Sequence, residues 1–275
     1  MSALTVRPAV DFRSTALWRG VVGVLVAVVL WEVSTQLDEW VGVAVPFLAA
    51  LPAPSEVAAD FGELVLTPGY WSSWSLSLQR VALGFGCALV LGGGLGLLMA
   101  SRPLLRQTFF PVLETLRPIP PLAWVPLAII FWPTAELSIA FVTFLGAFFP
   151  IVLNTVGGSD EIDRRYLLAA RSMGANKRVI FRRVILPATL PSLVTGAAVG
   201  MGITWEVVVA AELISGGGQG DGDGGLGFLV WNAYQGGDLP RVVVAMVSLG
   251  IAGYVASALV RRLGDHFMPW KKVSS

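Results

Sequence analysis

The residues that could do chemistry in this 275-residue chain are charged side chains that interrupt long apolar runs. Arg117, Glu206 and Glu212 each lie in or beside a stretch that is otherwise uncharged. An ionisable side chain in a membrane-length apolar segment is costly, and it typically binds a solute, moves a proton or pairs with another charge. These three positions are therefore the first candidates for contact with a charged solute.

The sequence contains few residues that could bind a metal or act as a nucleophile. Cys87 is the only cysteine and His266 the only histidine in the sequence, which excludes a disulfide framework and a multi-histidine metal site. Asp221 and Asp223 resemble the start of a calcium loop, but the later ligands are missing. The Gly-rich tract at 216–227 lacks the Gly-Lys-Ser/Thr ending of a phosphate loop. We expect no metal site and no catalytic residue.

The composition is that of a membrane protein, with 55% apolar residues, 13% charged residues and a mean hydropathy of +0.73. A helix needs about 20 mostly apolar residues to cross the hydrocarbon core. The long runs are continuously apolar and do not alternate, which favours helices over a β-barrel. We therefore predict an all-α membrane protein with six transmembrane helices, over residues 17–37, 81–100, 108–132, 137–156, 188–214 and 242–260.

Prolines interrupt the third predicted helix. Carbonyls that lose their partner to a proline are tolerated in a membrane only against protein or a water-filled cavity, so this segment could line a path. Arg117 could bind an anion there, or pair with Glu114 at i,i+3 spacing. Thr143, Asn154 and Thr195 could line a polar route or satisfy backbone groups, and the acidic candidates could instead face water. The candidate path residues are Arg117, Pro118, Pro120, Pro121, Trp124, Thr204, Glu206 and Glu212.

The charge distribution predicts the topology. Segments 1–19, 101–107, 158–186 and 261–275 hold most of the 19 Lys and Arg residues, whereas segments 38–73 and 215–240 hold none and carry acidic residues. The positive-inside rule therefore places both termini in the cytoplasm. We divide the chain into a cytoplasmic tail at 1–16, a six-helix transmembrane domain at 17–264 that includes the loop 159–187, and a cytoplasmic tail at 265–275. A cleaved signal peptide is the alternative for the first apolar run.

Small residues recur every four positions in two predicted helices and would let backbones approach closely. They are Gly84, Ala88, Gly92, Gly96 and Ala100 in one helix, and Gly196, Gly200 and Thr204 in the other. Packing within the bundle is the simple interpretation; a dimer contact or a moving interface is the alternative. Outside the bundle, residues 51–65 predict a short helix on the outer surface.

The segment 159–187 carries seven of the 19 basic residues and must lie in the cytoplasm. It predicts two short helices separated at Gly174, which suits the left-handed position that ends a helix. Asn176 can cap the second helix, and Leu186-Pro187 is expected to end it. A structured helix pair of this kind is suited to a protein partner; a basic hairpin lying on anionic headgroups is the alternative.

The spacing of Ala169-Ala170, Gly174 and Leu186-Pro187 resembles the cytoplasmic coupling motif of binding-protein-dependent ABC transporter permeases. Leu168 stands where the family has Glu, and Val184 where it has Ile. Segments 51–57, 116–124 and 209–214 are similar to the branch that serves nitrate, bicarbonate, taurine and other sulfonates. The resemblance implies a set of positions that contact the ATPase subunit, namely Leu168, Ala169, Ala170, Arg171, Met173, Gly174, Ala175, Leu186 and Pro187.

The resemblance also implies a type I importer permease fold in a bacterial inner membrane, working as a homodimer with two ATP-binding cassette ATPase subunits and an extracytoplasmic solute-binding protein. The chain itself would hold no cofactor, because ATP and Mg would bind the ATPase subunit. It would form the path for a small anion and would not be an enzyme. From the sequence we expect taurine or another organic sulfonate, with nitrate or bicarbonate as the alternative.

Two other classes of protein remain open at this point. A stand-alone ion-coupled carrier or channel would use Glu206 or Glu212 and need no ATPase. An intramembrane enzyme would need reactive side chains that the predicted spans lack.

Overall fold

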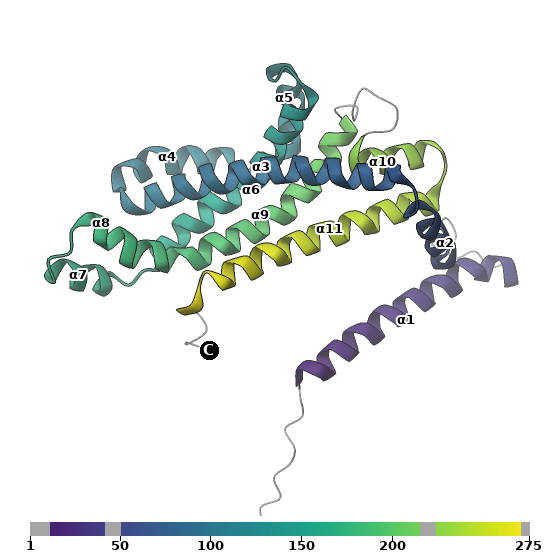
Figure 1. Cartoon of the computed structure of the whole chain (residues 1–275), viewed down its shortest axis with the longest axis horizontal. Coiled ribbons are helices and arrows are strands. Elements are labelled where there is room, and N and C mark those ends of the chain that lie inside the picture. The colour runs from purple at the N-terminus through teal and green to yellow at the C-terminus, as the bar shows by residue number, and fades with distance from the viewer. Residues whose placement is uncertain (1–11, 42–50, 215–223, 271–275) are drawn as a thin grey trace, which may run out of the picture.

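The computed structural model describes residues 12–41, 51–214 and 224–270, and its regular elements are helices (Figure 1). Five helical segments in these ranges are long and apolar enough to cross a membrane. The all-α prediction is confirmed. The predicted tails, and the part of the Gly-rich tract with Asp221 and Asp223, lie largely or wholly outside the described residues. The five helices are α1 (Phe12–Val41), α3 (Pro68–Ser101), α6 (Ala135–Asp160), α9 (Leu186–Ile214) and α11 (Leu239–His266).

The third predicted span, 108–132, does not form one helix. It is divided into α4 (Pro103–Leu116), a short 3-10 turn η1 (Pro121–Trp124) and α5 (Val125–Phe131). Pro118, Pro120 and Pro121 lie at the break, where three residues without an N–H cannot continue a helical ladder. In Figure 1, α4 lies along α3 while α5 projects away from the bundle. The six-helix prediction thus becomes five long helices and one interrupted segment in the described chain.

Helix α6 lies at the centre of the bundle, and both small-residue stripes pack against it. A Cβ added at Gly84 of α3 would lie 2.1 Å from Thr143 Oγ1, and one at Gly96 would lie 2.7 Å from Thr155 Cβ. On the other side, a Cβ at Gly196 of α9 would lie 2.6 Å from the carbonyl oxygen of Pro150. The two stripes therefore set close backbone contacts within this chain, as the simpler interpretation predicted.

One end of the bundle carries two short helices, α2 (Pro54–Leu64) and α10 (Gly225–Gln235). The surface helix predicted at 51–65 is therefore present. Arg241 of α11 binds Asp60 of α2 at 2.9 Å and so ties α2 to the bundle. Glu32 of α1 accepts hydrogen bonds from the backbone N–H and the hydroxyl of Ser55. Apart from this link, α1 lies away from the other long helices in Figure 1, and its window Trp18–Leu37 has no buried residue.

The basic segment 159–187 contains α7 (Arg164–Ser172) and α8 (Lys177–Ile180), which lie together at one end of the bundle in Figure 1. The predicted second helix does not end at Leu186-Pro187: α8 runs through a π-helical turn, η2 (Phe181–Ile185), directly into α9. The N–H of Leu186 bonds to the carbonyl of Phe181, five residues back. We attribute the continuity to this wider turn, because it offers a way to carry a proline without the usual clash with the preceding turn.

Candidate functional site: a polar groove beside the central helix

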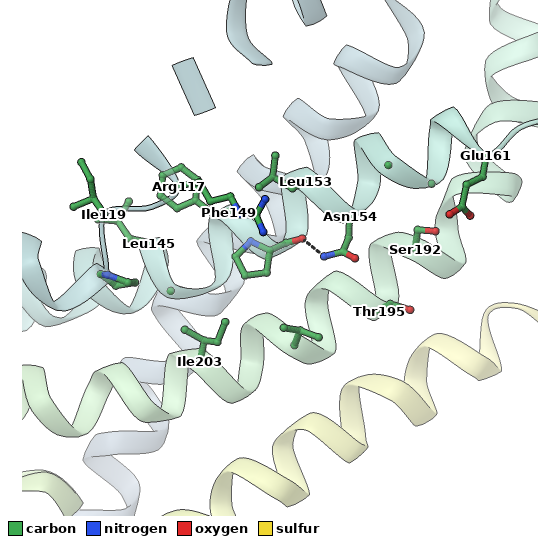
Figure 2. Close-up of a pocket in the computed structure, with 16 residues that line it drawn as sticks. Arg117, Ile119, Leu145, Phe149, Leu153, Asn154, Glu161, Ser192, Thr195 and Ile203 are labelled. Atoms are coloured by element: carbon green, nitrogen blue, oxygen red, sulfur yellow. Dashed lines mark hydrogen bonds between the residues drawn. The ribbon is translucent and has the colours of Figure 1, made fainter. Parts of the chain in front are cut away.

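A groove with a cavity volume of about 710 Å³ lies between α6, α9 and the break before η1 (Figure 2). Most of its wall is apolar, with five side chains that carry charge or hydrogen-bonding groups. The cation, Arg117, lies at the break before η1, and the anion, Glu161, directly follows α6. Figure 2 shows the two residues at opposite ends of the groove. The polar lining residues are Arg117, Asn154, Glu161, Ser192 and Thr195.

Arg117 is the residue of the groove best suited to bind an anion. Its side chain is exposed, and none of the ion pairs formed by the described residues involves it. The alternative pairing with Glu114 is therefore not formed. An arginine without a carboxylate partner keeps its five N–H donors available, and the planar guanidinium matches the geometry of oxyanions.

Two kinked helices supply the other polar groups. Pro150 interrupts the hydrogen bonds of α6, and Asn154 Nδ2 donates to the Pro150 carbonyl at 2.8 Å. Pro191 has the same effect in α9, where Thr195 Oγ1 donates to the Pro191 carbonyl at 2.9 Å. Ser192 packs closely against Gly158, where a Cβ would lie 2.4 Å from its hydroxyl. Asn154 and Thr195 thus bond to the backbone and line the groove at once, so both sequence interpretations apply to them.

The structure brings only some of the predicted path residues together. Arg117 and Pro121 line the groove, whereas Trp124 packs against an apolar cluster of α6. Thr204 is buried and donates to the carbonyls of Gly200 and Thr143, which satisfies backbone groups between helices. Pro118, Pro120 and Glu206 are exposed and lie outside the groove lining.

Glu212 has a different environment: it is fully buried near the C-terminal end of α9 and paired with Arg80 of α3. Arg80 Nη1 donates to Glu212 Oε1 at 2.9 Å, and Ser77 Oγ donates to the same oxygen at 2.8 Å. The guanidinium also binds Glu136 at the start of α6 through Nε and Nη2. One arginine therefore joins α3, α6 and α9 at the end of the bundle that carries α10.

The same cluster fixes the start of α10. Gly227 N donates to Glu212 Oε2 at 2.8 Å, and Leu226 N donates to Ser77 Oγ at 2.8 Å. Gly225 has φ +78°, and a Cβ there would lie 2.3 Å from the Glu212 carboxylate. The end of the Gly-rich tract thus belongs to α10 and permits close packing onto a buried charge.

Sequence reasoning missed Arg80 and Glu136, although one signal was available. Arg80 is one of few basic residues outside the cytoplasmic segments, and a lone arginine at the edge of a long apolar run calls for a carboxylate partner.

Another ion pair lies at the end of the bundle that carries α7 and α8. Arg106 of α4 binds Asp160, the last residue of α6, through both terminal nitrogens at 2.5 and 2.7 Å. The hydrogen bonds to Asp160 raise the pKa of Arg106 above its ordinary value, so this guanidinium stays charged. Asp163, which caps the start of α7, follows only three residues later, so the ion pair links α4 to the segment that leads into α7.

Capping hydrogen bonds end α7 and begin α8. Gly174 has φ +78°, its N–H bonds to the Arg171 carbonyl at 2.9 Å, and Ala175 N bonds to the Ala170 carbonyl at 3.0 Å. These bonds form a Schellman motif, as the glycine predicted. Asn176 Oδ1 accepts from Val179 N at 3.0 Å and caps α8, also as predicted. The pair leaves large side chains in the solvent, with Tyr166, Leu168 and Met173 exposed by 68%, 59% and 80%.

Comparison with known proteins gives consistent matches. Residues 92–273 match the family model described as the inner membrane component of binding-protein-dependent transport systems. A nitrate import permease protein of Leptolyngbya laminosa is 33% identical over 225 residues, 78% of each chain. A putative ABC transporter permease protein of Methanocaldococcus jannaschii is 37% identical over 198 residues, 72% of each chain. A bicarbonate transport system permease protein of Synechococcus elongatus is 32% identical over 201 residues, 73% of this chain and 67% of the relative.

We predict that Arg80→Met strongly destabilises the protein, because it leaves the buried Glu212 carboxyl without its partner. Loss of one member of a buried pair costs about 3–5 kcal/mol. Glu136→Gln is the matched control: this side chain is 57% exposed, and an exposed pair contributes about 1 kcal/mol or less. The double variant Arg80→Met/Glu212→Leu should recover much of the stability. Thermal unfolding in detergent checks this, and equal losses for Arg80→Met and Glu136→Gln would contradict it.

Proposed function

Because the chain belongs to the inner membrane components of binding-protein-dependent transport systems, we propose that it is the permease subunit of an ATP-driven importer of small inorganic anions. It is a membrane-embedded transport component and not the catalytic subunit of such a system. We propose that an ATPase subunit binds ATP and Mg in the cytoplasm, that a solute-binding protein delivers the anion outside, and that both termini of this chain face the cytoplasm. The observation that carries the anion assignment is the unpaired Arg117 in a groove between membrane helices.

Nitrate or bicarbonate is the substrate class that we propose. The relatives described above are named for nitrate and bicarbonate, which supports the alternative stated from the sequence and gives no support to taurine. Both ions are small, planar and singly charged. They suit a groove in which a single guanidinium faces mostly apolar walls, since one cation can balance one negative charge.

The groove supports a second part of the proposal, that two copies of this chain enclose the path. The polar side chains of α6 and α9 lie in a groove open along one side of the single chain. Polar groups facing lipid would lose their hydrogen bonds to water, so an open polar groove needs a second wall. A second copy would supply that wall and a second Arg117.

We further propose that α7 and the following turn dock on the ATPase subunit. The positions implied by the motif, Leu168 to Ala175, surround the Schellman turn, and the exposed Leu168 and Met173 offer apolar contact area outside the membrane. Leu168 replaces the acidic residue of the motif, so the contact at this position would be apolar and not charged. Movement of α7 would reach the groove through the end of α6, where Asp160 pairs with Arg106 and the next residue, Glu161, lines the groove.

The anion assignment is tested by uptake into liposomes that contain the assembled complex, the solute-binding protein and ATP. Arg117→Gln should raise the half-saturating anion concentration about ten-fold, since a hydrogen bond to a charged group contributes roughly 1.5–3 kcal/mol. Arg262→Gln is the matched control, because Arg262 is also exposed but lies outside the groove. Unchanged uptake of both anions by Arg117→Gln would argue against the role of Arg117, and no ATP-driven uptake of either anion by the unmodified complex would refute the proposed function.

Docking is tested by Gly174→Val and Ala169→Arg. A β-branched residue is strained at φ +78°, and a long charged side chain at the exposed Ala169 would obstruct a close contact. Both variants should insert in the membrane and hydrolyse ATP with the ATPase subunit, yet lose most anion uptake. Gly62→Val serves as the control, since this glycine lies on the outer helix α2 with nothing within 4 Å of an added Cβ. Normal uptake in both variants would end the docking proposal.

A further inference from the structure

The polar groups of the groove can be sorted into donors and acceptors of hydrogen bonds. Asn154 Nδ2 donates to the Pro150 carbonyl, the bond drawn as a dashed line in Figure 2. A carbonyl can only accept, so the amide nitrogen must face it. The amide oxygen of Asn154 is then left to accept from another group, and one of its two N–H donors also remains. At the level of this side chain, the groove offers one acceptor and one donor.

Thr195 also offers an acceptor. Its hydroxyl hydrogen is used in the bond to the Pro191 carbonyl, so only the oxygen lone pairs remain for a solute. The backbone adds to this pattern, because Pro150 has no N–H to donate to the carbonyl of Gly146, and Gly146 lines the groove. Pro150 and Pro191 thus favour hydrogen-bond acceptors on the faces of α6 and α9 that line the groove.

Donors are fewer among the described residues that line the groove. Arg117 is the cation, the Asn154 amide keeps one N–H, and the Ser192 hydroxyl can donate or accept. Glu161, at the other end of the groove in Figure 2, accepts when it is ionised. A solute that moves from Arg117 toward Glu161 therefore leaves a guanidinium and meets a series of oxygen acceptors.

This pattern distinguishes the two proposed substrates. Nitrate and bicarbonate are both planar anions with three oxygens, but nitrate can only accept hydrogen bonds, whereas bicarbonate carries one O–H. We infer that the groove selects an anion that also donates a hydrogen bond, and therefore favours bicarbonate over nitrate. An acceptor that faces another acceptor stays unpaired and pays the cost of its lost water. The inference rests on the proposed function, since it requires the anion to pass through this groove.

The test compares uptake of bicarbonate and of nitrate by one reconstituted complex, with the same ATPase subunit and solute-binding protein throughout. Because only the groove changes, a shift in the ratio of the two rates reports on the groove. Thr195→Val removes one acceptor while keeping a similar size, and Asn154→Leu removes one acceptor together with one donor. Thr195→Val should lower bicarbonate uptake at subsaturating concentration about ten-fold and leave nitrate uptake roughly unchanged, and Asn154→Leu should lower bicarbonate uptake more than nitrate uptake.

Thr115→Val is the matched control. Thr115 Oγ1 donates to the Pro111 carbonyl four residues back, as Thr195 does to Pro191, but Thr115 lies outside the groove. Its substitution should leave both rates unchanged. An unchanged ratio in Thr195→Val and Asn154→Leu, or an unmodified complex that prefers nitrate, would overturn the inference while the importer assignment stands. An unmodified complex that carries neither anion would overturn the proposed function, and the inference with it.

Discussion

The close approach of α3 and α9 to α6 is the constraint on which this structure depends. Lipid tails are as apolar as leucine, so helices in a bilayer gain little from burying apolar side chains and associate through close packing. Gly84 and Gly96 on one side of α6, and Gly196 on the other, leave no space for a Cβ. Helix α6 is held between its neighbours, and its remaining face, bent at Pro150, becomes the wall of the groove.

The basic residues outside the cytoplasmic segments form ion pairs, with Arg117 as the exception. Three basic residues lie outside the cytoplasmic segments, and each has a defined environment. Arg80 is buried with two carboxylates, and Arg241 pairs with Asp60 and Asp238 at the outer surface. Arg117 has no ion pair in the described chain and faces the groove. Two of these cations therefore link helices through ion pairs, and the third is the one that we propose binds the solute.

Local patterns predicted the helices, the short outer helix and the cytoplasmic turn, because hydropathy, charge bias and Gly174 each act within a few residues. The partner of Glu212 was not predictable in this way: Arg80 lies 132 positions earlier in the chain, and only the packing of α3 on α9 brings them together. The continuous helix through Pro187 was missed for another reason. A π-turn shifts the backbone hydrogen bonds by one residue, and no residue type in the sequence marks that shift. The sequence singled out Arg117 as a charge in an apolar stretch, but the groove that it lines could not be predicted, because α6 and α9 form most of that groove.

The central claim is that the groove carries water and anions across the membrane. The direct measurement is the reaction of single cysteines with a membrane-impermeant thiol reagent in the assembled complex, after Cys87, the only native cysteine, is replaced by serine. Val199 in the groove and Val255 on α11 are similarly exposed in the single chain, at 50% and 56%. A cysteine at 199 should react, and excess anion should slow it, while a cysteine at 255 should face lipid and stay unreactive. Equal reactivity at the two positions, with no effect of the anion, would contradict the account.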